Sequence, residues 1–150
     1  MALQLNEKQL ATLNSNFLGT LSTIRHSDGL ISSNPVGFTW NGKEVEVSTI
    51  KGRIKYHNVL ADPRATFCVI DPDDHMTYVE IRGNVRVEDD IDKQYLRAQF
   101  KKHTGDELPD DLDPPDAERV VLYLTPEQVS SPQLYGGRFD NKYDIKGQED

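Results

Sequence analysis

Trp40-Asn-Gly-Lys-Glu-Val-Glu-Val-Ser-Thr-Ile50 contains the strongest hairpin signal of the chain, the dipeptide Asn41-Gly42. Asn-Gly readily adopts the positive φ angles that a tight turn requires, and the alternating residues that follow predict a returning strand over 44–50. Gly52 then provides a sharp turn, and apolar residues at helical spacing predict a helix over 53–61. This part of the chain therefore predicts a hairpin followed directly by a helix.

Further strands and helices are expected on both sides of this hairpin. A capping-box sequence at Asn6 predicts a short first helix, and runs rich in β-branched and aromatic residues predict strands. Pro35 marks an edge strand or a bulge because proline cannot donate a ladder hydrogen bond, and Gly83 marks a bulge. The expected strands cover 17–25, 30–40, 44–50, 64–70, 76–88 and 119–129, and the expected helices cover 6–16, 53–61 and 90–103.

The order of these elements predicts a mainly β fold with small helices. Hairpin connections dominate, so the sheet is expected to be mainly antiparallel, and six strands suit a barrel whose closure removes the sheet edges. In the last helix, Ile91, Tyr95, Leu96 and Phe100 are expected to form one apolar stripe. Residues 106–118 hold seven acids, three prolines and no basic residue, which predicts a solvated loop. We expect one domain over 1–130 and a polar C-terminal tail over 131–150.

Composition excludes several classes of function. The 150 residues include 17 Lys and Arg against 25 Asp and Glu, so the formal charge of −8 argues against binding to nucleic acid or anionic membranes. The single cysteine, Cys68, excludes an intrachain disulfide, and four scattered histidines predict no metal site. The first residues do not resemble a secretory signal, and no apolar run approaches the roughly 20 residues of a membrane span. A cytoplasmic protein is expected.

A basic segment follows the returning strand of the hairpin. Residues 51–64 contain four Lys or Arg and one His against a single acid, a balance of about +3 in a chain of −8. Cations at a helix start oppose the helix dipole unless an anion binds there, so the segment predicts a phosphate site. The alternative is a solvated face that balances acids elsewhere. Arg53 and Lys55 can converge on one phosphate only if part of this segment stays extended, because residues two apart in a helix point to different sides.

Six stretches, in order along about residues 10 to 130, carry a resemblance to a known family: 19–29, 32–36, 47–58, 62–66, 78–83 and 120–124. With them the sequence resembles the pyridoxamine 5′-phosphate oxidase-like split β-barrel proteins. Within that superfamily it is similar to the branch of small actinobacterial oxidoreductases that depend on the deazaflavin F420. The resemblance implies a homodimer of split barrels with two cofactor sites at the subunit interface.

The resemblance also implies which residues hold the cofactor. Its phosphate region would be bound by Ser48, Thr49, Arg53 and Lys55, with Lys51 and Asn58 as helpers. Its ring system would lie along Asn34, Pro35 and Val36, and the other subunit of the dimer would add Met76 and Tyr78.

The implied function is hydride transfer from reduced F420 to a small conjugated or electron-poor acceptor. A reduced deazaflavin carries the hydride itself, so no catalytic residue is named and none of the usual catalytic triads is needed. The first alternative is an FMN-dependent enzyme, including a pyridoxamine-phosphate oxidase. The second alternative is a protein that binds a flavin, a deazaflavin or haem without turnover.

Overall fold

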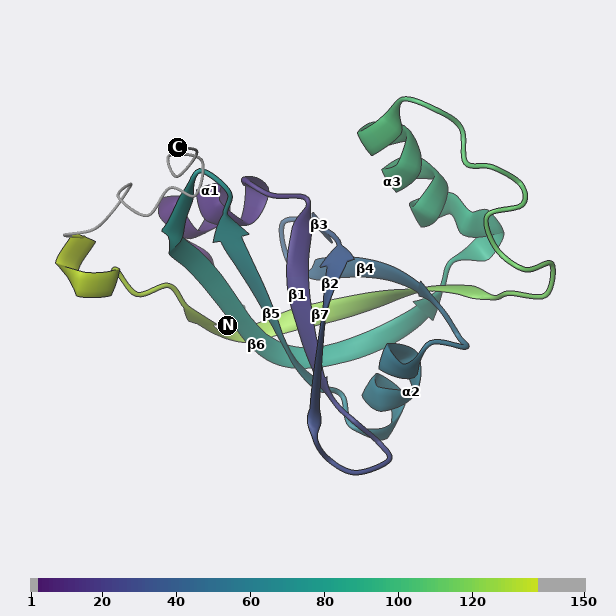
Figure 1. The fold of residues 1–150 in the computed structure, drawn as a ribbon, viewed down its shortest axis with the longest axis horizontal. Coiled ribbons are helices and arrows are strands. Elements are labelled where there is room, and N and C mark those ends of the chain that lie inside the picture. Colours follow the sequence, from purple (N-terminus) through teal and green to yellow (C-terminus); the bar gives the residue numbers. More distant parts are fainter. Residues whose placement is uncertain (1–2, 138–150) are drawn as a thin grey trace, which may run out of the picture.

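The computed structural model describes residues 3–137 and shows a seven-stranded sheet with three α-helices (Figure 1). Two short 3₁₀ segments precede α3 and follow β7. The elements, in order, are α1 (Glu7–Asn14), β1 (Leu18–Ile24), β2 (Ile31–Gly37), β3 (Thr39–Trp40), β4 (Val45–Ile50), α2 (Ile54–Ala61), β5 (Arg64–Asp71), β6 (Asp74–Asp89), η1 (Ile91–Lys93), α3 (Gln94–Thr104), β7 (Arg119–Ser130) and η2 (Leu134–Gly137).

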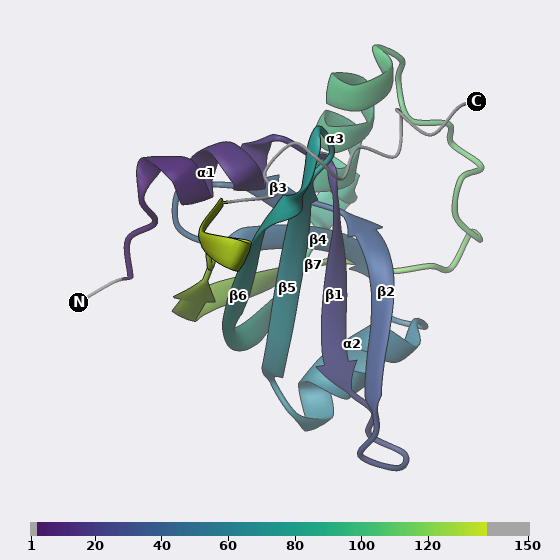
Figure 2. The same cartoon turned by 60° about the vertical axis from the view of Figure 1, so that its left-hand side comes forward.

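The sheet is antiparallel throughout, with the strand order β2-β1-β5-β6-β7-β4-β3. Its two end strands are one segment of chain, because β2 continues into β3 with only Phe38 between them. The sheet curls until β2 approaches β4, so β2, β1, β5 and β6 face the viewer in Figure 2 with β7 and β4 behind them. This arrangement is the predicted split barrel.

Two details of the prediction need correction. The expected strand 30–40 is interrupted at Phe38, so the structure has seven strands where the sequence predicts six. Phe38 is buried and its ring packs edge-on against Phe67 at a centroid distance of 4.8 Å, which turns the chain at this point. The two ends of the sheet are therefore connected by the covalent chain from β2 to β3 and not by hydrogen bonds. In the described sheet, β2 keeps one edge without a hydrogen-bonded strand. Pro35 lies on this edge strand, which is one of the two positions predicted for it.

The core lies inside the curl and is filled by alternate residues of the strands. Leu21, Phe67 and Ile81 come from three neighbouring strands and are almost completely buried. Leu13 of α1 is also fully buried and covers one end of this core. The predicted capping box begins α1, since the Asn6 side chain accepts from the Gln9 amide and Gln9 reaches back to the Asn6 amide.

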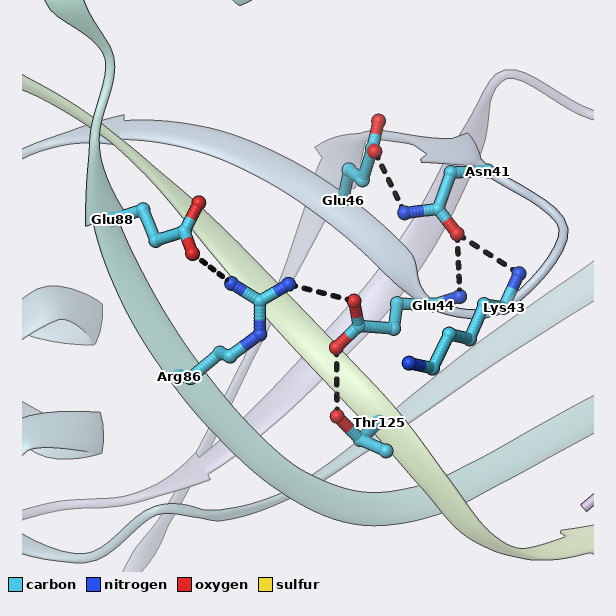
Figure 3. A network of polar contacts seen from close by, with 7 residues as sticks. All are labelled: Asn41, Lys43, Glu44, Glu46, Arg86, Glu88 and Thr125. Atoms are coloured by element: carbon cyan, nitrogen blue, oxygen red, sulfur yellow. Dashed lines mark hydrogen bonds and ion pairs between the residues drawn. The ribbon is translucent and has the colours of Figure 1, made fainter. Parts of the chain in front are cut away.

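The β3–β4 hairpin is held against the sheet by a buried carboxylate (Figure 3). Glu44 is 5% exposed, and it accepts hydrogen bonds from Arg86 of β6 at 2.8 Å and from Thr125 of β7 at 2.7 Å. Burial alone would raise the pKa of Glu44, but these two hydrogen bonds outweigh it and hold the pKa below its usual value. Gly42 takes the positive φ of 92° that the turn requires. The local Asn-Gly signal is thus reinforced by a long-range contact.

Residues 90–118 differ from their prediction in two respects. No residue of α3 is fully buried, and Ile91, expected on its apolar stripe, is 71% exposed because it lies in the separate η1 turn. The acidic loop is partly anchored: Asp113 binds Arg119 through two hydrogen bonds of 2.6 and 2.8 Å and pairs with Lys93 at 3.4 Å. These contacts hold the pKa of Asp113 below its usual value. The helices within residues 3–137 are all too short or too polar to cross a membrane.

Candidate functional site

The junction between β4 and α2 brings Arg53 and Lys55 together. Arg53 is the N-cap of α2 and has extended backbone angles of φ −82° and ψ 147°, so the helix begins only at Ile54. This geometry meets the condition under which Arg53 and Lys55 can face one anion. Among the described residues, no side chain caps the helix, and its first turn contains no acid. Its first backbone amides therefore remain available to a ligand.

Lys55 is a partly buried cation beside a second cation. Burial lowers the pKa of Lys55, and the nearby Arg53 lowers it further. Among residues 3–137, no carboxylate forms an ion pair with either side chain. A partly buried ammonium beside an exposed guanidinium is less favourable than a fully hydrated one, and a bound anion would offset this cost. The junction therefore presents two cations without a carboxylate partner among residues 3–137, which is the arrangement that a phosphate site requires.

The other residues expected near the phosphate have different surroundings. Thr49 is 4% exposed and faces the core, whereas Ser48 lies on the opposite side of β4, 3.4 Å from Arg119. Lys51 pairs with Asp89 at 3.3 Å and with Glu118 at 3.6 Å, which raises its pKa. The structure therefore brings together Arg53 and Lys55, but it does not bring Thr49 to their surface and it neutralises Lys51.

Asn58 lies inside the protein. It is 1% exposed, and its side chain bonds to His26 and Thr23 at distances of 3.0–3.1 Å. These contacts direct the amide away from solvent and toward the end of β1.

The residues expected along the cofactor ring lie on β2. Pro35 is exposed and pairs with Thr20 of β1, while Asn34 and Val36 are half-buried on the other side of the strand. Val36 packs against the core. Because successive residues of a strand point to opposite sides, a planar ligand on either side can meet only part of this set through side chains.

Met76 and Tyr78 lie far from the β4–α2 junction within one chain. Tyr78 pairs with Ile70, whereas Arg64, which follows α2 closely, pairs with Asn84 at the other end of the β5–β6 ladder. The separation of six positions from Tyr78 to Asn84 corresponds to roughly 20 Å along β6. One subunit alone therefore does not assemble the complete set of predicted residues.

A cleft of about 220 Å³ separates α3 from the sheet, and the sequence reasoning did not identify it. Figure 1 shows α3 standing apart from the strands. Phe17, Phe38 and Leu96 provide apolar walls, and Ser48, Tyr95, Gln99, His103 and Arg119 provide polar groups. The signal in the sequence was the spacing of residues 95, 96, 99 and 103, which places them on one face of a helix.

Tyr95 lines this cleft and is held by hydrogen bonds. Its hydroxyl donates to the Glu46 carbonyl at 3.1 Å and lies 2.7 Å from the Thr39 hydroxyl, and burial raises the pKa of Tyr95. The phenol is therefore a neutral, well-ordered group at neutral pH. Ser48 lines the cleft and is also one of the residues expected to hold the cofactor.

A larger groove of about 470 Å³ lies on the outer side of the sheet. It is lined by residues of β1, β2, β5, β6 and β7, including Ser22, Ile31, Thr66 and Arg82, and it contains none of the predicted site residues. Further along the same side of the sheet, Leu18 of β1 and Ile70 of β5 are 42% and 47% exposed. This side of the described sheet is thus partly apolar and open.

The curled antiparallel sheet and its basic strand-to-helix junction place the chain in the class of small split-barrel proteins. The chain belongs to the pyridoxamine 5′-phosphate oxidase family, whose model matches residues 5–131. The family and fold predicted from the sequence are therefore confirmed.

Solved structures with the same fold carry several descriptions. A protein named F420 reductase has a TM-score of 0.71 and 29% identity, over 84% of this chain and 98% of its own. A FAD-binding protein from Mesorhizobium loti has a TM-score of 0.59 and 22% identity, over 85% of this chain and 94% of its own. A heme binding protein from Mycobacterium smegmatis has a TM-score of 0.65 and 19% identity, over 90% of this chain and 57% of its own. The last two identities are low and show a likeness of fold alone.

Proposed function

We propose that the protein is an F420-dependent oxidoreductase that transfers a hydride from the reduced deazaflavin to a small conjugated or electron-poor acceptor. The observation that carries this proposal is the pairing of Arg53 with the partly buried Lys55, without a carboxylate partner among residues 3–137. Family membership and the 29% identity to an F420 reductase support the cofactor class.

In this proposal the protein binds and orients the cofactor and the acceptor, and the cofactor performs the redox chemistry. When bound, the reduced deazaflavin supplies the hydride. Arg53, Lys55 and the first amides of α2 hold the phosphate by charge-assisted hydrogen bonds. The cleft under α3 seats the acceptor, where apolar walls exclude water and Gln99 and His103 provide hydrogen bonds.

We also propose that the active form is a homodimer. Met76 and Tyr78 lie at the wrong end of β6 to join Arg53 and Lys55 in one chain, but a second copy can bring them to the same site. The open outer side of β2, β1, β5 and β6, with Leu18, Ile31 and Ile70 exposed, offers an apolar surface for that copy.

The second candidate is an FMN-dependent enzyme. It is favoured by the family, whose model is that of pyridoxamine 5′-phosphate oxidase. A phosphate bound at Arg53 and Lys55 suits FMN as well as F420, since both cofactors carry a phosphate on the chain attached to the ring system.

The test is a fluorescence titration of the protein with F420 and with FMN, followed by turnover with the reduced form of the tighter ligand. We expect F420 to bind more tightly by at least about tenfold, a difference of about 1.4 kcal/mol. Reduced F420 should then be oxidised by a panel of enones, quinones and nitro compounds. Tighter binding of FMN would favour the second candidate, and binding without faster oxidation of the cofactor would favour a protein that binds without turnover.

A further inference from the structure

Asn58 is a buried amide whose contacts join two parts of the proposed cofactor site. It lies in the middle of α2 with 1% of its surface exposed. Its Oδ1 accepts from the His26 backbone amide at 3.1 Å and from His26 Nδ1 at 3.0 Å, and its Nδ2 donates to Thr23 Oγ1 at 3.0 Å. These contacts cross 32 and 35 residues of sequence.

The partners of Asn58 belong to the segment that leads into β2. Thr23 is the last but one residue of β1, and His26 lies near the start of the loop between β1 and β2. Strand β2 carries the residues expected along the cofactor ring, Asn34 to Val36, while α2 carries the proposed phosphate ligands Arg53 and Lys55. One amide therefore links α2 to the end of β1, and β1 is paired in turn with β2.

Resting on the proposed function, we infer that Asn58 is a positioning residue that holds these two segments in register and does not itself contact the cofactor. The hydrogen-bond pattern explains why an amide is needed. Oδ1 must accept from two donors of His26, and Nδ2 must donate to a hydroxyl oxygen, so an apolar side chain of similar size leaves all of these groups unpaired. Without them, α2 stays packed on the core through Tyr56 and Val59 but loses the polar contacts that set its position against the end of β1.

The inference predicts different effects on the affinities for inorganic phosphate and for the complete cofactor. Inorganic phosphate needs only Arg53, Lys55 and the start of α2, which belong to one short local segment. The complete cofactor spans both α2 and β2, so its binding also depends on how the two segments are placed. Loss of positioning should therefore weaken the cofactor and leave the affinity for inorganic phosphate unchanged.

The main variant is Asn58→Leu, measured by titration with F420, FMN and inorganic phosphate and by hydrogen exchange. We expect cofactor affinity to fall by roughly tenfold or more, because the buried Thr23 hydroxyl and two donors of His26 lose their partner. Phosphate affinity should stay within about twofold, as additivity of independent contacts predicts. Amide exchange should accelerate in both 25–36 and 53–61.

Two further variants control the result. Asn58→Asp keeps an oxygen for His26, and its second oxygen can accept the Thr23 hydroxyl, so it should restore most of the cofactor affinity and slow the exchange again. Leu13→Ala removes a fully buried side chain of α1 and destabilises the protein elsewhere. It should lower the melting temperature but leave cofactor affinity and the exchange of 25–36 unchanged.

Equal losses of phosphate and cofactor affinity would overturn the inference and make Asn58 part of the phosphate site. Unchanged exchange in 25–36 would overturn it too. If the wild type binds neither F420 nor FMN, the proposed function fails, but the exchange pattern still decides whether Asn58 fixes the two segments.

Discussion

At the scale of single residues, Arg53 and Lys55 are two neighbouring positive charges that repel each other. No carboxylate in residues 3–137 forms an ion pair with either of them. Lys51, two positions earlier, pairs with Asp89 and Glu118. Lys51 is thus already paired with carboxylates, whereas Arg53 and Lys55 can still pair with an anionic ligand. A sequence pattern of four basic residues cannot make this distinction, because Asp89 and Glu118 are distant in the chain.

We expect Arg53→Ala and Lys55→Ala each to weaken cofactor binding by roughly 10- to 150-fold, the contribution of a charge-assisted hydrogen bond. The double variant should be non-additive, since both side chains would contact one phosphate. Fluorescence titration measures the dissociation constants, and Lys43→Ala, an exposed lysine of the hairpin turn, is the control. Affinities within about twofold of wild type in both variants, with a normal circular dichroism spectrum, would refute the phosphate site.

Lys55 also predicts a dependence on pH. Its pKa in the free protein is lowered, by burial first and by Arg53 second, whereas a bound phosphate favours the charged form. Cofactor affinity should therefore decrease as the pH rises, starting at a lower pH than an ordinary lysine would give. Lys55→Arg keeps its charge at high pH and should remove this decrease. Titrations along an alkaline pH series measure the effect, and identical profiles for the two proteins would contradict it.

At the scale of elements, the long strand β6 depends on a glycine where it meets β7. A Cβ atom at Gly83 would lie 1.9 Å from the backbone oxygen of Thr125, next to the register shift between Arg82 and Gly83. A bulge is therefore present opposite Gly83, but its extra residue, Glu127, belongs to β7, and the close approach of the two backbones explains the glycine.

Gly83→Ala should lower the free energy of unfolding by about 1–3 kcal/mol or more, because two paired strands must separate to admit the methyl group. Gly52→Ala is the matched control: a Cβ there has no neighbour within 4 Å, and the expected change is within about 0.5 kcal/mol. Denaturant unfolding measures both. Equal stabilities of the two variants would show that the strands adapt without cost.

Elements with a local cause were predictable, and those with a distant cause were not. Asn41-Gly42 and the capping box at Asn6 carry their signals within a few residues, and both appear in the structure as expected. The break at Phe38 has no local signal, because it arises from packing against Phe67. The site divides in the same way: the charge at Arg53 and Lys55 is visible in the sequence, whereas the burial of Asn58 against His26 requires the fold.

At the scale of the whole molecule, the open side of the sheet predicts a dimer. Light scattering at micromolar concentration should give twice the chain mass of 17.0 kDa. Ile31→Glu places a charge on this side, where Ile31 is 73% exposed, and should shift the protein toward the monomer and weaken cofactor binding. Ile91→Glu changes an equally exposed isoleucine of η1 and should leave the dimer intact. A monomeric wild type would contradict the proposed homodimer.

Strand β7 has a consequence for how the protein is made. It lies between β6 and β4 in the sheet, yet it is the last of the seven strands to leave the ribosome. Until residues 119–130 emerge, β4 can pair only with the two-residue β3, and both β4 and β6 present open edges to other chains. The described sheet can therefore be completed only after residues 119–130 have been synthesised. A chain that ends at residue 118 should show no cooperative unfolding by circular dichroism, and a cooperative transition would mean that the other strands form a stable sheet alone.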